Sequence, residues 1–207
     1  MTSSVSGFLM ACKRFAVTGG IACGKSTVAK LLPEFGGIVL DTDDVAHRLE
    51  GPGGEAVPEI VRSFGKVVLS EDGSIDRRKL GPIVFSDSDA LARLDSIIHP
   101  LVVREVSDWL QRPCEARFKA VIVPLLFECG FDTAFKWDAI LAVVCGEGEQ
   151  LRRLRGRGLD DSASRKRIAS QLPCEWKARR ADRVIRNDSD LKALRKEVEK
   201  TLEALLV

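Results

Sequence analysis

Four residues near the start of the chain have the types and spacing of a phosphate-binding loop: Gly19, Gly24, Lys25 and Ser26. Glycines let the backbone wrap closely around phosphate oxygens, and N–H groups at the start of a helix attract anions. We expect Lys25 to bridge the terminal phosphates of a nucleotide and the Ser26 hydroxyl to bind Mg²⁺. The alternative is a chance match in a turn. We favour the loop because an apolar run precedes it and a helical pattern follows it.

A second group of polar residues follows the next apolar run. Asp41 ends the run "GIVLD", and Asp43 and Asp44 come directly after it. Carboxylates at the carboxyl end of a parallel strand face the ligand crevice of an open α/β sheet. One could hold Mg²⁺ and another could orient or deprotonate a hydroxyl nucleophile, roles that we favour for Asp41 and Asp43. The alternative is an Asp-rich turn that caps a helix starting near Val45, which suits Asp44 best.

Arginines are concentrated between positions 152 and 167. Their helical spacing is also typical of a solvated helix face, and a basic segment can bind RNA. Aromatic residues do not alternate with these arginines, which argues against nucleic acid. In a protein that binds phosphates, an arginine on a lid can instead neutralise charge in the transition state. The six residues are Arg152, Arg153, Arg155, Arg157, Arg165 and Arg167.

The elements expected around these residues alternate strands with helices, which predicts an α/β fold with a parallel five-stranded sheet flanked by helices. The third apolar run is nearly continuous, as in a buried central strand. A helix is expected from about Lys25, and a last helix over about 189–206. The five expected strands are 14–18, 37–41, 119–127, 139–145 and 183–187.

Two stretches interrupt this alternation. Residues 55–112 have helical patterns, and one helix should begin at Pro100, because proline is tolerated in a first turn. Residues 149–180 carry the arginines, also on helical spacing. We therefore predict a helical acceptor domain over 55–112, a helical lid over 149–180 and a nucleotide-binding core. The core is expected to comprise residues 13–54, 113–148 and 181–207.

The composition is that of an ordinary globular protein, with 45% hydrophobic and 30% charged residues. A net charge of +2 points to neither a nucleic acid nor a membrane as partner. No apolar run is long enough to span a bilayer, and residues 1–12 lack the features of a secretory signal, so we expect a cytoplasmic protein with a loose extension there. The six cysteines lack metal-binding spacing and are expected to be reduced, and Cys23, beside a helix start, should have a lowered thiol pKa.

Taken together, the motifs resemble those of the dephospho-CoA kinase family, from about residue 15 to residue 200. The loop alone indicates only a nucleotide-binding protein, whereas the ordered combination is specific. The matching segments are "VTGGIACGKSTVA" (17–29), "LDTDDVAH" (40–47), "DGSIDRRKLGPIVF" (72–85), "IIHP" (97–100), "VPLLFECG" (123–130), "QLRRLRGR" (150–157), "RIASQ" (167–171) and "ADRVIRN" (181–187).

This resemblance implies a P-loop fold and transfer of the γ-phosphate of ATP, with Mg²⁺, to the ribose 3′-hydroxyl of dephospho-CoA. It implies catalytic roles for Lys25, for Asp43 as the general base and for Arg157 of the lid, while Ser26 and Asp41 serve the metal. The implied ATP-binding residues are Gly20, Ile21, Ala22, Cys23, Gly24, Lys25, Ser26, Thr27, Arg153 and Asn187, the last as a candidate adenine contact. The implied acceptor-binding residues are Thr18, Asp43, His47, Arg77, His99, Pro124 and Leu125.

The sequence departs from the family at several positions. Members commonly have Gly and Ser where this chain has Ala22 and Cys23, Asp-Ala-Asp where Thr42 intervenes, and arginine in place of His47. The expected partners are ATP and dephospho-CoA, with the chain a monomer or a weak homo-oligomer. The alternatives are a kinase for a nucleoside monophosphate or another small hydroxyl acceptor, and a nucleotide-dependent RNA-binding protein.

Overall fold

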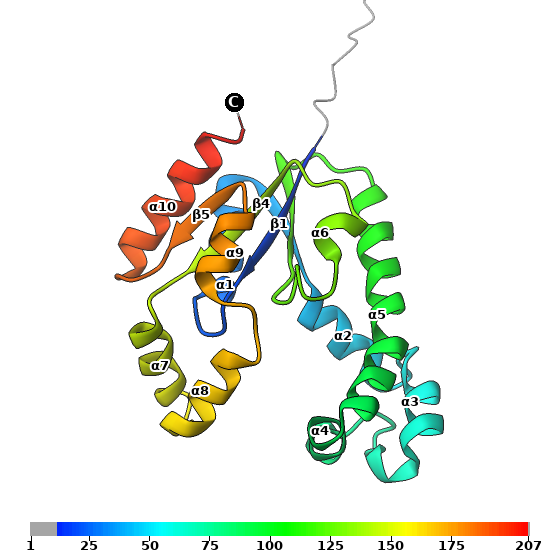
Figure 1. Ribbon diagram of the computed structural model, residues 1–207. Coiled ribbons are helices and arrows are strands. Elements are labelled where there is room, and N and C mark those ends of the chain that lie inside the picture. Colours follow the sequence, from blue (N-terminus) through cyan, green and yellow to red (C-terminus); the bar gives the residue numbers. More distant parts are fainter. Residues whose placement is uncertain (1–11, 207) are drawn as a thin grey trace, which may run out of the picture. The chain divides into compact units, whose positions relative to one another are not determined.

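The structure, a computed structural model, describes residues 12–206 (Figure 1). Its strands form a parallel sheet in the order β2-β3-β1-β4-β5, which confirms the expected five-stranded architecture. The extension expected over residues 1–12 lies outside the described residues except for Cys12. The strands are β1 Lys13–Gly19, β2 Gly37–Asp41, β3 Phe118–Ile122, β4 Ala139–Val144 and β5 Arg183–Arg186.

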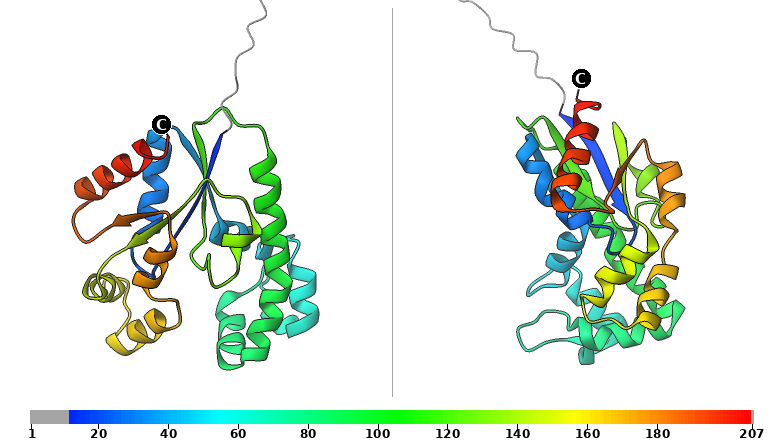
Figure 2. Two further views of the ribbon diagram at one scale, coloured as in Figure 1. Left: turned by 45° about the horizontal axis from the view of Figure 1, so that its top comes forward. Right: turned by 90° about the vertical axis from the view of Figure 1, so that its left-hand side faces the viewer.

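The chain divides into two compact units. Unit 1 comprises the residues up to Val39, Pro113–Ala120 and the residues from Leu125 onward. In this unit β4 pairs with β1 on one side and β5 on the other, with Thr18 of β1 opposite Ala142. Figure 2 (right) shows α1 in blue and α10 in red on one face of these strands and α9 in orange on the other. The loop after β1 is thereby attached to a packed sheet.

Apolar residues explain this packing. The middle of β1, Phe15 to Val17, is buried. The predicted inward stripe is also buried, with Val28 and Leu31 in the first helix and Leu32 directly after it. The two short helices that follow β4, α7 and α8, pack on each other. The remaining elements of unit 1 are α1 Lys25–Leu31, η1 Leu32–Phe35, α6 Phe131–Ala134, α7 Glu147–Arg155, α8 Asp161–Ala169, α9 Cys174–Arg180 and α10 Leu191–Glu203.

Unit 2 comprises Leu40–Arg112 and Val121–Pro124. Its long helix α5 packs against α2, α3 and α4, which line it in Figure 1. The buried residues of α5 are Ala90, Val102, Val106 and Leu110, and the last three recur at helical spacing. The elements of unit 2 are α2 Thr42–Glu50, α3 Val57–Phe64, η2 Lys66–Val68, α4 Arg77–Ser86 and α5 Ser88–Gln111. No helix among the described residues is long and apolar enough to cross a membrane.

The expected helix start at Pro100 is wrong, because Pro100 lies inside the 24-residue helix α5. A proline inside a helix removes one backbone hydrogen bond and crowds the preceding turn. The helix continues because Ala90 before the proline and Val102, Val106 and Leu110 after it are all buried. Tertiary packing of this stripe outweighs the local preference of proline for a helix start.

The third strand is shorter than expected, since β3 ends at Ile122 and the apolar residues up to Phe127 form a turn. Proline has no N–H to donate to a sheet, so Pro124 cannot continue the ladder. Leu126 is nevertheless buried, which explains why the sequence stays apolar beyond the strand. The run therefore combines a central strand with a packed turn.

Candidate active site

The phosphate-binding loop predicted from the sequence connects β1 with α1. Its backbone has positive φ at Gly19 (149°), Ala22 (58°) and Gly24 (99°). Ala22 is the only residue other than glycine with positive φ between residues 12 and 206, and it stands where the family commonly has glycine. A left-handed conformation costs a residue with a Cβ about 1–2 kcal/mol. The loop therefore stores strain that its surroundings must offset.

Lys25 closes one side of this loop. Its ammonium group donates hydrogen bonds to the carbonyl oxygens of Gly19, at 3.0 Å, and Gly20, at 2.9 Å. Both contacts are formed with the residues that precede the helix. The side chain thus lies over the loop in which the sequence predicts bound phosphates.

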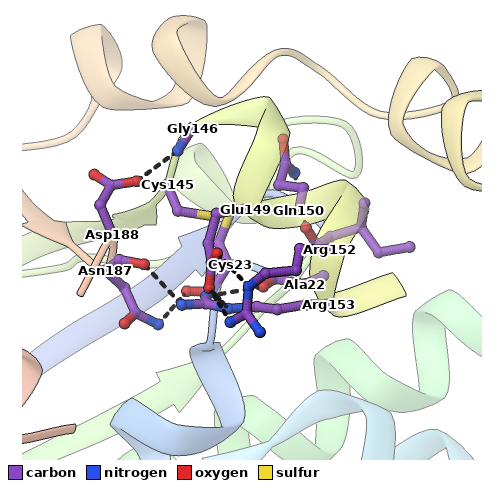
Figure 3. Close-up of polar contacts among 11 residues, drawn as sticks. Ala22, Cys23, Cys145, Gly146, Glu149, Gln150, Arg152, Arg153, Asn187 and Asp188 are labelled. Carbon is purple, nitrogen blue, oxygen red and sulfur yellow. Dashed lines mark hydrogen bonds and ion pairs between the residues drawn. The ribbon is translucent and has the colours of Figure 1, made fainter. Parts of the chain in front are cut away.

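Three side chains distant in sequence hold the next three carbonyl oxygens (Figure 3). Gln150 Nε2 donates to the carbonyl of Ile21 at 2.7 Å, Arg153 Nη1 to that of Ala22 at 3.1 Å, and Asn187 Nδ2 to that of Cys23 at 2.8 Å. Every carbonyl from residue 19 to residue 23 thus accepts a hydrogen bond from a side chain. With the carbonyls engaged, the backbone N–H groups are what the loop can offer to an anion.

The donors are themselves fixed. Gln150 and Asn187 are buried, and Arg153 also donates to the carbonyl of Asn187 at 2.9 Å. Glu149, one turn before Arg153, forms an ion pair with it at 2.7 Å. Hydrogen bonds from Arg152 and the charge of Arg153 lower the pKa of Glu149 to about 2. Arg153 is thereby held by a carboxylate and two carbonyls.

Gln150 and Glu149 are not among the site residues predicted from the sequence, although Gln150 begins the segment "QLRRLRGR" of the family resemblance. A glutamine at a buried position of an otherwise charged helix indicates a candidate site residue, because a buried polar side chain needs a hydrogen-bond partner. The partner lies 129 residues away in the chain, so its identity required the fold.

The expected lowering of the Cys23 thiol pKa is wrong. A hydrogen bond with Cys145, together with burial of the thiol, raises the pKa of Cys23 to about 11. A buried, neutral environment therefore outweighs the field of the helix start. The neighbouring Cys145 has the opposite shift: its hydrogen bond with Cys23 and the charge of Arg153 lower its pKa.

Most arginines of the predicted lid have carboxylate partners. Arg152 and Arg153 pair with Glu149, Arg155 with Asp161, and Arg165 with Glu147. Neither Arg157 nor Arg167 forms an ion pair within residues 12–206, and the exposed side chain of Arg157 lies beyond the end of α7. Of the predicted site residues in this segment, Arg157 is therefore the one whose charge is not already engaged.

In unit 2 the predicted carboxylates lie at the start of α2. Asp41, not Asp44, is the N-cap, and its Oδ1 accepts from the N–H of Asp43 at 2.9 Å. The helix begins at Thr42, three residues earlier than expected. Thr42 takes the place of the alanine common in the family, and its Oγ1 donates to the carbonyl of Ile122 at 3.0 Å. This hydrogen bond connects the start of α2 with the end of β3.

One face of α2 carries three polar residues at helical spacing: Asp43, His47 and Glu50. Asp43 and His47 are exposed, whereas Glu50 is buried and accepts from Arg77 Nε at 2.5 Å. This ion pair borders a cavity of about 290 Å³. The cavity is lined by His47, Glu50, Gly51, Pro52, Asp72, Ser74, Ile75 and Arg77. Unit 2 thus brings two of the predicted acceptor-binding residues, His47 and Arg77, to one cavity.

The other predicted acceptor-binding residues lie elsewhere. His99 is half-buried within α5, and its charge opposes the rise in pKa that burial causes at Asp95, one turn earlier. Pro124 and Leu125 lie in the turn after β3, and Leu125 is exposed. Thr18 is buried in β1. None of these four lines the cavity beside Arg77.

Comparisons with known proteins agree with this arrangement. A family model for dephospho-CoA kinase matches residues 14–193. A dephospho-CoA kinase of Bdellovibrio bacteriovorus is 36% identical over 195 residues, covering 93% of this chain and 96% of the relative. The structure is similar to that of TT1252 from Thermus thermophilus, with a TM-score of 0.81, 35% identity and coverage of 95% and 98%.

A dephospho-CoA kinase from Campylobacter jejuni shares the fold, with a TM-score of 0.62 at 24% identity, covering 94% of this chain and 98% of that one. The family match spans both units and includes the loop, the aspartates of α2 and the arginines that follow β4. The chain belongs to the dephospho-CoA kinase family, which phosphorylates dephospho-CoA with ATP to give coenzyme A.

Proposed function

We propose that unit 1 binds ATP through residues 19–27 and that Lys25 neutralises charge on the β- and γ-phosphates. The observation that carries this proposal is the set of side-chain donors on every carbonyl from Gly19 to Cys23. A loop held in this way needs little reorganisation when phosphate binds, and such preorganised dipoles stabilise developing charge effectively. Arg153 and Asn187 then act on ATP through the loop, and Asn187 is also proposed to contact the adenine.

Mg²⁺ is proposed to bind at Ser26 and Asp41. A hydroxyl and a carboxylate are oxygen donors of the kind that Mg²⁺ prefers. The residues from 12 to 206 contain no cluster of three or more His, Cys, Asp or Glu side chains suited to a metal ion. That fits this ion, because Mg²⁺ usually takes one or two carboxylates and completes its shell with phosphate oxygens and water. When bound, it would neutralise charge on the phosphates.

The acceptor hydroxyl is proposed to be the ribose 3′-hydroxyl, oriented and deprotonated by Asp43. The exposed carboxylate of Asp43 lies on the face of α2 that continues to His47 and Glu50. Its backbone N–H is bound by Asp41, so the first turn that carries the side chain is fixed. Positioning of the nucleophile, more than covalent chemistry, is what phosphoryl transfer needs from the protein.

Arg157 is proposed as the lid arginine that stabilises the transferring phosphoryl group. The three arginines of α7 form ion pairs with Glu149 and Asp161, whereas Arg157, which follows this helix, remains available to a ligand. It lies next to Gly158, whose φ of 84° lets the chain turn sharply there. The helices of residues 149–180 are proposed as the lid, and those of residues 55–112 as the acceptor domain. His99, Thr18, Pro124 and Leu125 remain proposed acceptor contacts.

Replacing Arg77 by alanine should weaken binding of the acceptor but not of ATP. The guanidinium borders the cavity of unit 2 and is oriented by the buried Glu50, so it can donate to an anionic acceptor. A hydrogen bond to a charged group contributes about 1.5–3 kcal/mol, which corresponds to an increase of about tenfold or more in KM for dephospho-CoA. Steady-state kinetics with each substrate varied in turn measures this effect.

Arg78→Ala is the matched control, because the neighbouring side chain is 94% exposed and pairs only loosely with Asp76 at 3.7 Å. It should leave both KM values unchanged. An equal loss in the two variants, or a rise in KM for ATP alone in Arg77→Ala, would contradict the assignment of Arg77 to the acceptor.

A further inference from the structure

Three thiols meet at the phosphate-binding loop. Cys23 Sγ lies 3.3 Å from Cys145 Sγ, at the end of β4, and 3.4 Å from Cys174 Sγ, at the start of α9. These residues are 122 and 151 positions from Cys23 in the chain, so the fold and not the sequence brings them together. Cys23 itself is fully buried within the loop. A change in the covalent state of Cys23 would therefore act directly on the loop backbone.

The two partners of Cys23 differ in reactivity. Cys145 Sγ lies 4.0 Å from Arg153 Nη1 (Figure 3), and the residue Cys145 as a whole is 6% exposed. The hydrogen bond with Cys23 and the positive charge of Arg153 lower the pKa of Cys145, whereas hydrogen bonding and burial raise that of Cys174. Because the thiolate is the nucleophile, the lowered pKa and the neighbouring guanidinium of Arg153 favour Cys145 as the first thiol of this cluster to react with an oxidant.

We propose that Cys145 and Cys23 form a reversible disulfide when the protein meets hydrogen peroxide, and that this bond disables the phosphate-binding loop. The Cys145 thiolate attacks one peroxide oxygen, the O–O bond breaks, and hydroxide leaves and takes up a proton. The Cys23 thiol then attacks the sulfenic sulfur, gives up its proton and releases water. The two thiols lose two electrons and two protons, and hydrogen peroxide becomes two water molecules.

Formation of the bond requires the two sulfur atoms to move toward each other. A disulfide is about 2.05 Å long, so the two sulfurs must approach by more than 1 Å from their 3.3 Å separation. Cys145 follows a packed strand, whereas Cys23 lies beside the strained Ala22, so the loop is expected to yield. A displacement of about 1 Å at a reacting group can cost about 10²-fold in rate. This consequence rests on the proposed role of the loop in ATP binding, whereas formation of the bond does not.

A second close pair of thiols requires a control. Cys12 and Cys114 lie 3.2 Å apart, away from the loop, and burial raises the pKa of Cys12 to about 11. Oxidation of this pair would confuse any count of thiols. The experiment is therefore done on the full chain with Cys12→Ser and Cys114→Ser, called the test protein below.

The test protein is treated with hydrogen peroxide, digested without reduction and analysed by mass spectrometry, and its kcat/KM for ATP is measured before and after. We expect a cross-link between the peptides of Cys23 and Cys145, a fall of about 10²-fold in kcat/KM, and recovery of both with dithiothreitol. Adding Cys145→Ser should abolish the cross-link and the loss. Adding Cys174→Ser, or Cys129→Ser at an exposed position, should abolish neither.

Several results would overturn the proposal: no cross-link at full oxidation, a cross-link from Cys23 to Cys174 instead, or an equal loss of activity with Cys145→Ser. If the Cys23–Cys145 bond is mapped but kcat/KM is undiminished, the proposal that this bond disables the phosphate-binding loop is overturned. The proposed function fails separately, and visibly, if the reduced test protein does not use ATP at all. A reduced protein that is active and never cross-links leaves the proposed function intact and removes only the disulfide.

Discussion

Asp43→Asn is expected to retain ATP binding and to lose most of its turnover. Asparagine has nearly the same size, so the first turn of α2 and the hydrogen bond from the backbone N–H of residue 43 to Asp41 should persist. The variant loses only the negative charge and the ability to accept a proton. Positioned general bases contribute about 10²–10⁴-fold to rates, so kcat should fall within that range.

The measurement is kcat for the release of ADP in the presence of dephospho-CoA, together with a direct titration of ATP. Asp44→Asn is the matched control, because Asp44 is the next residue, is also exposed and does not cap the helix. Asp44→Asn should have the same kcat and the same affinity for ATP as the unaltered chain. Near-normal turnover of Asp43→Asn would remove Asp43 from the mechanism, and an equal loss in both variants would point to damage of α2.

The second large effect is expected for Lys25→Ala. In the proposed reaction the ammonium group neutralises charge on the phosphates, and removal of one such preorganised donor costs about 2.7–4 kcal/mol, or about 10²–10³-fold in kcat. The variant also loses two hydrogen bonds to the carbonyls of Gly19 and Gly20. We therefore expect weaker ATP binding as well, since two carbonyl oxygens are released beside the phosphates.

Lys30→Ala tests whether the effect is local. Lys30 is on the same helix, is exposed and faces away from the buried stripe of Val28 and Leu31. Its removal lowers the net charge by the same amount, so a general electrostatic effect on ATP would appear equally in both variants. Steady-state kinetics with ATP varied measures the difference. A value of kcat for Lys25→Ala close to that of Lys30→Ala would contradict the assignment.

The sheet could be predicted from the sequence because its signals are local. Short apolar runs bounded by glycine or polar residues indicated β1, β2, β4 and β5 within a residue or two at their ends. The apolar run that contains β3 predicted too long a strand, because Leu126 is buried in the turn that follows the strand and not in the strand itself. An apolar residue indicates burial but does not distinguish a strand from a packed turn. Only Pro124, which has no N–H for the sheet, indicates where the strand must end.

Helix boundaries were predicted less well where packing outweighs local preference. Pro100 is a poor residue for a helix interior, yet α5 continues through it because the helix has buried residues on both sides of the proline and packs against the other helices of unit 2. Helix α2 begins at Thr42 because Asp41 caps it, and the Thr42 hydroxyl also binds the carbonyl of Ile122, 80 residues away. Neither the helices that pack against α5 nor the carbonyl that binds Thr42 can be identified from the local sequence.

The residues of the loop could be predicted, but the network that holds it could not. Glycine spacing and Lys25 identify a phosphate loop because the motif lies within a few residues. Gln150 and Asn187 reach that loop from 129 and 164 residues away. The same distance explains the wrong expectation for Cys23, since its pKa is set by Cys145 and burial and not by the adjacent helix. Residues distant in sequence therefore determine which side chains hold the loop and what the pKa of Cys23 is, and the motif alone predicts neither.

The most direct test of the central claim is to follow ADP and coenzyme A together in one reaction with ATP and Mg²⁺. The account predicts that dephospho-CoA accelerates ADP release, that one coenzyme A appears for each ADP, and that an analogue lacking the ribose 3′-hydroxyl or a nucleoside monophosphate gives no such acceleration. ADP release that dephospho-CoA does not stimulate, or that proceeds without formation of coenzyme A, would contradict it.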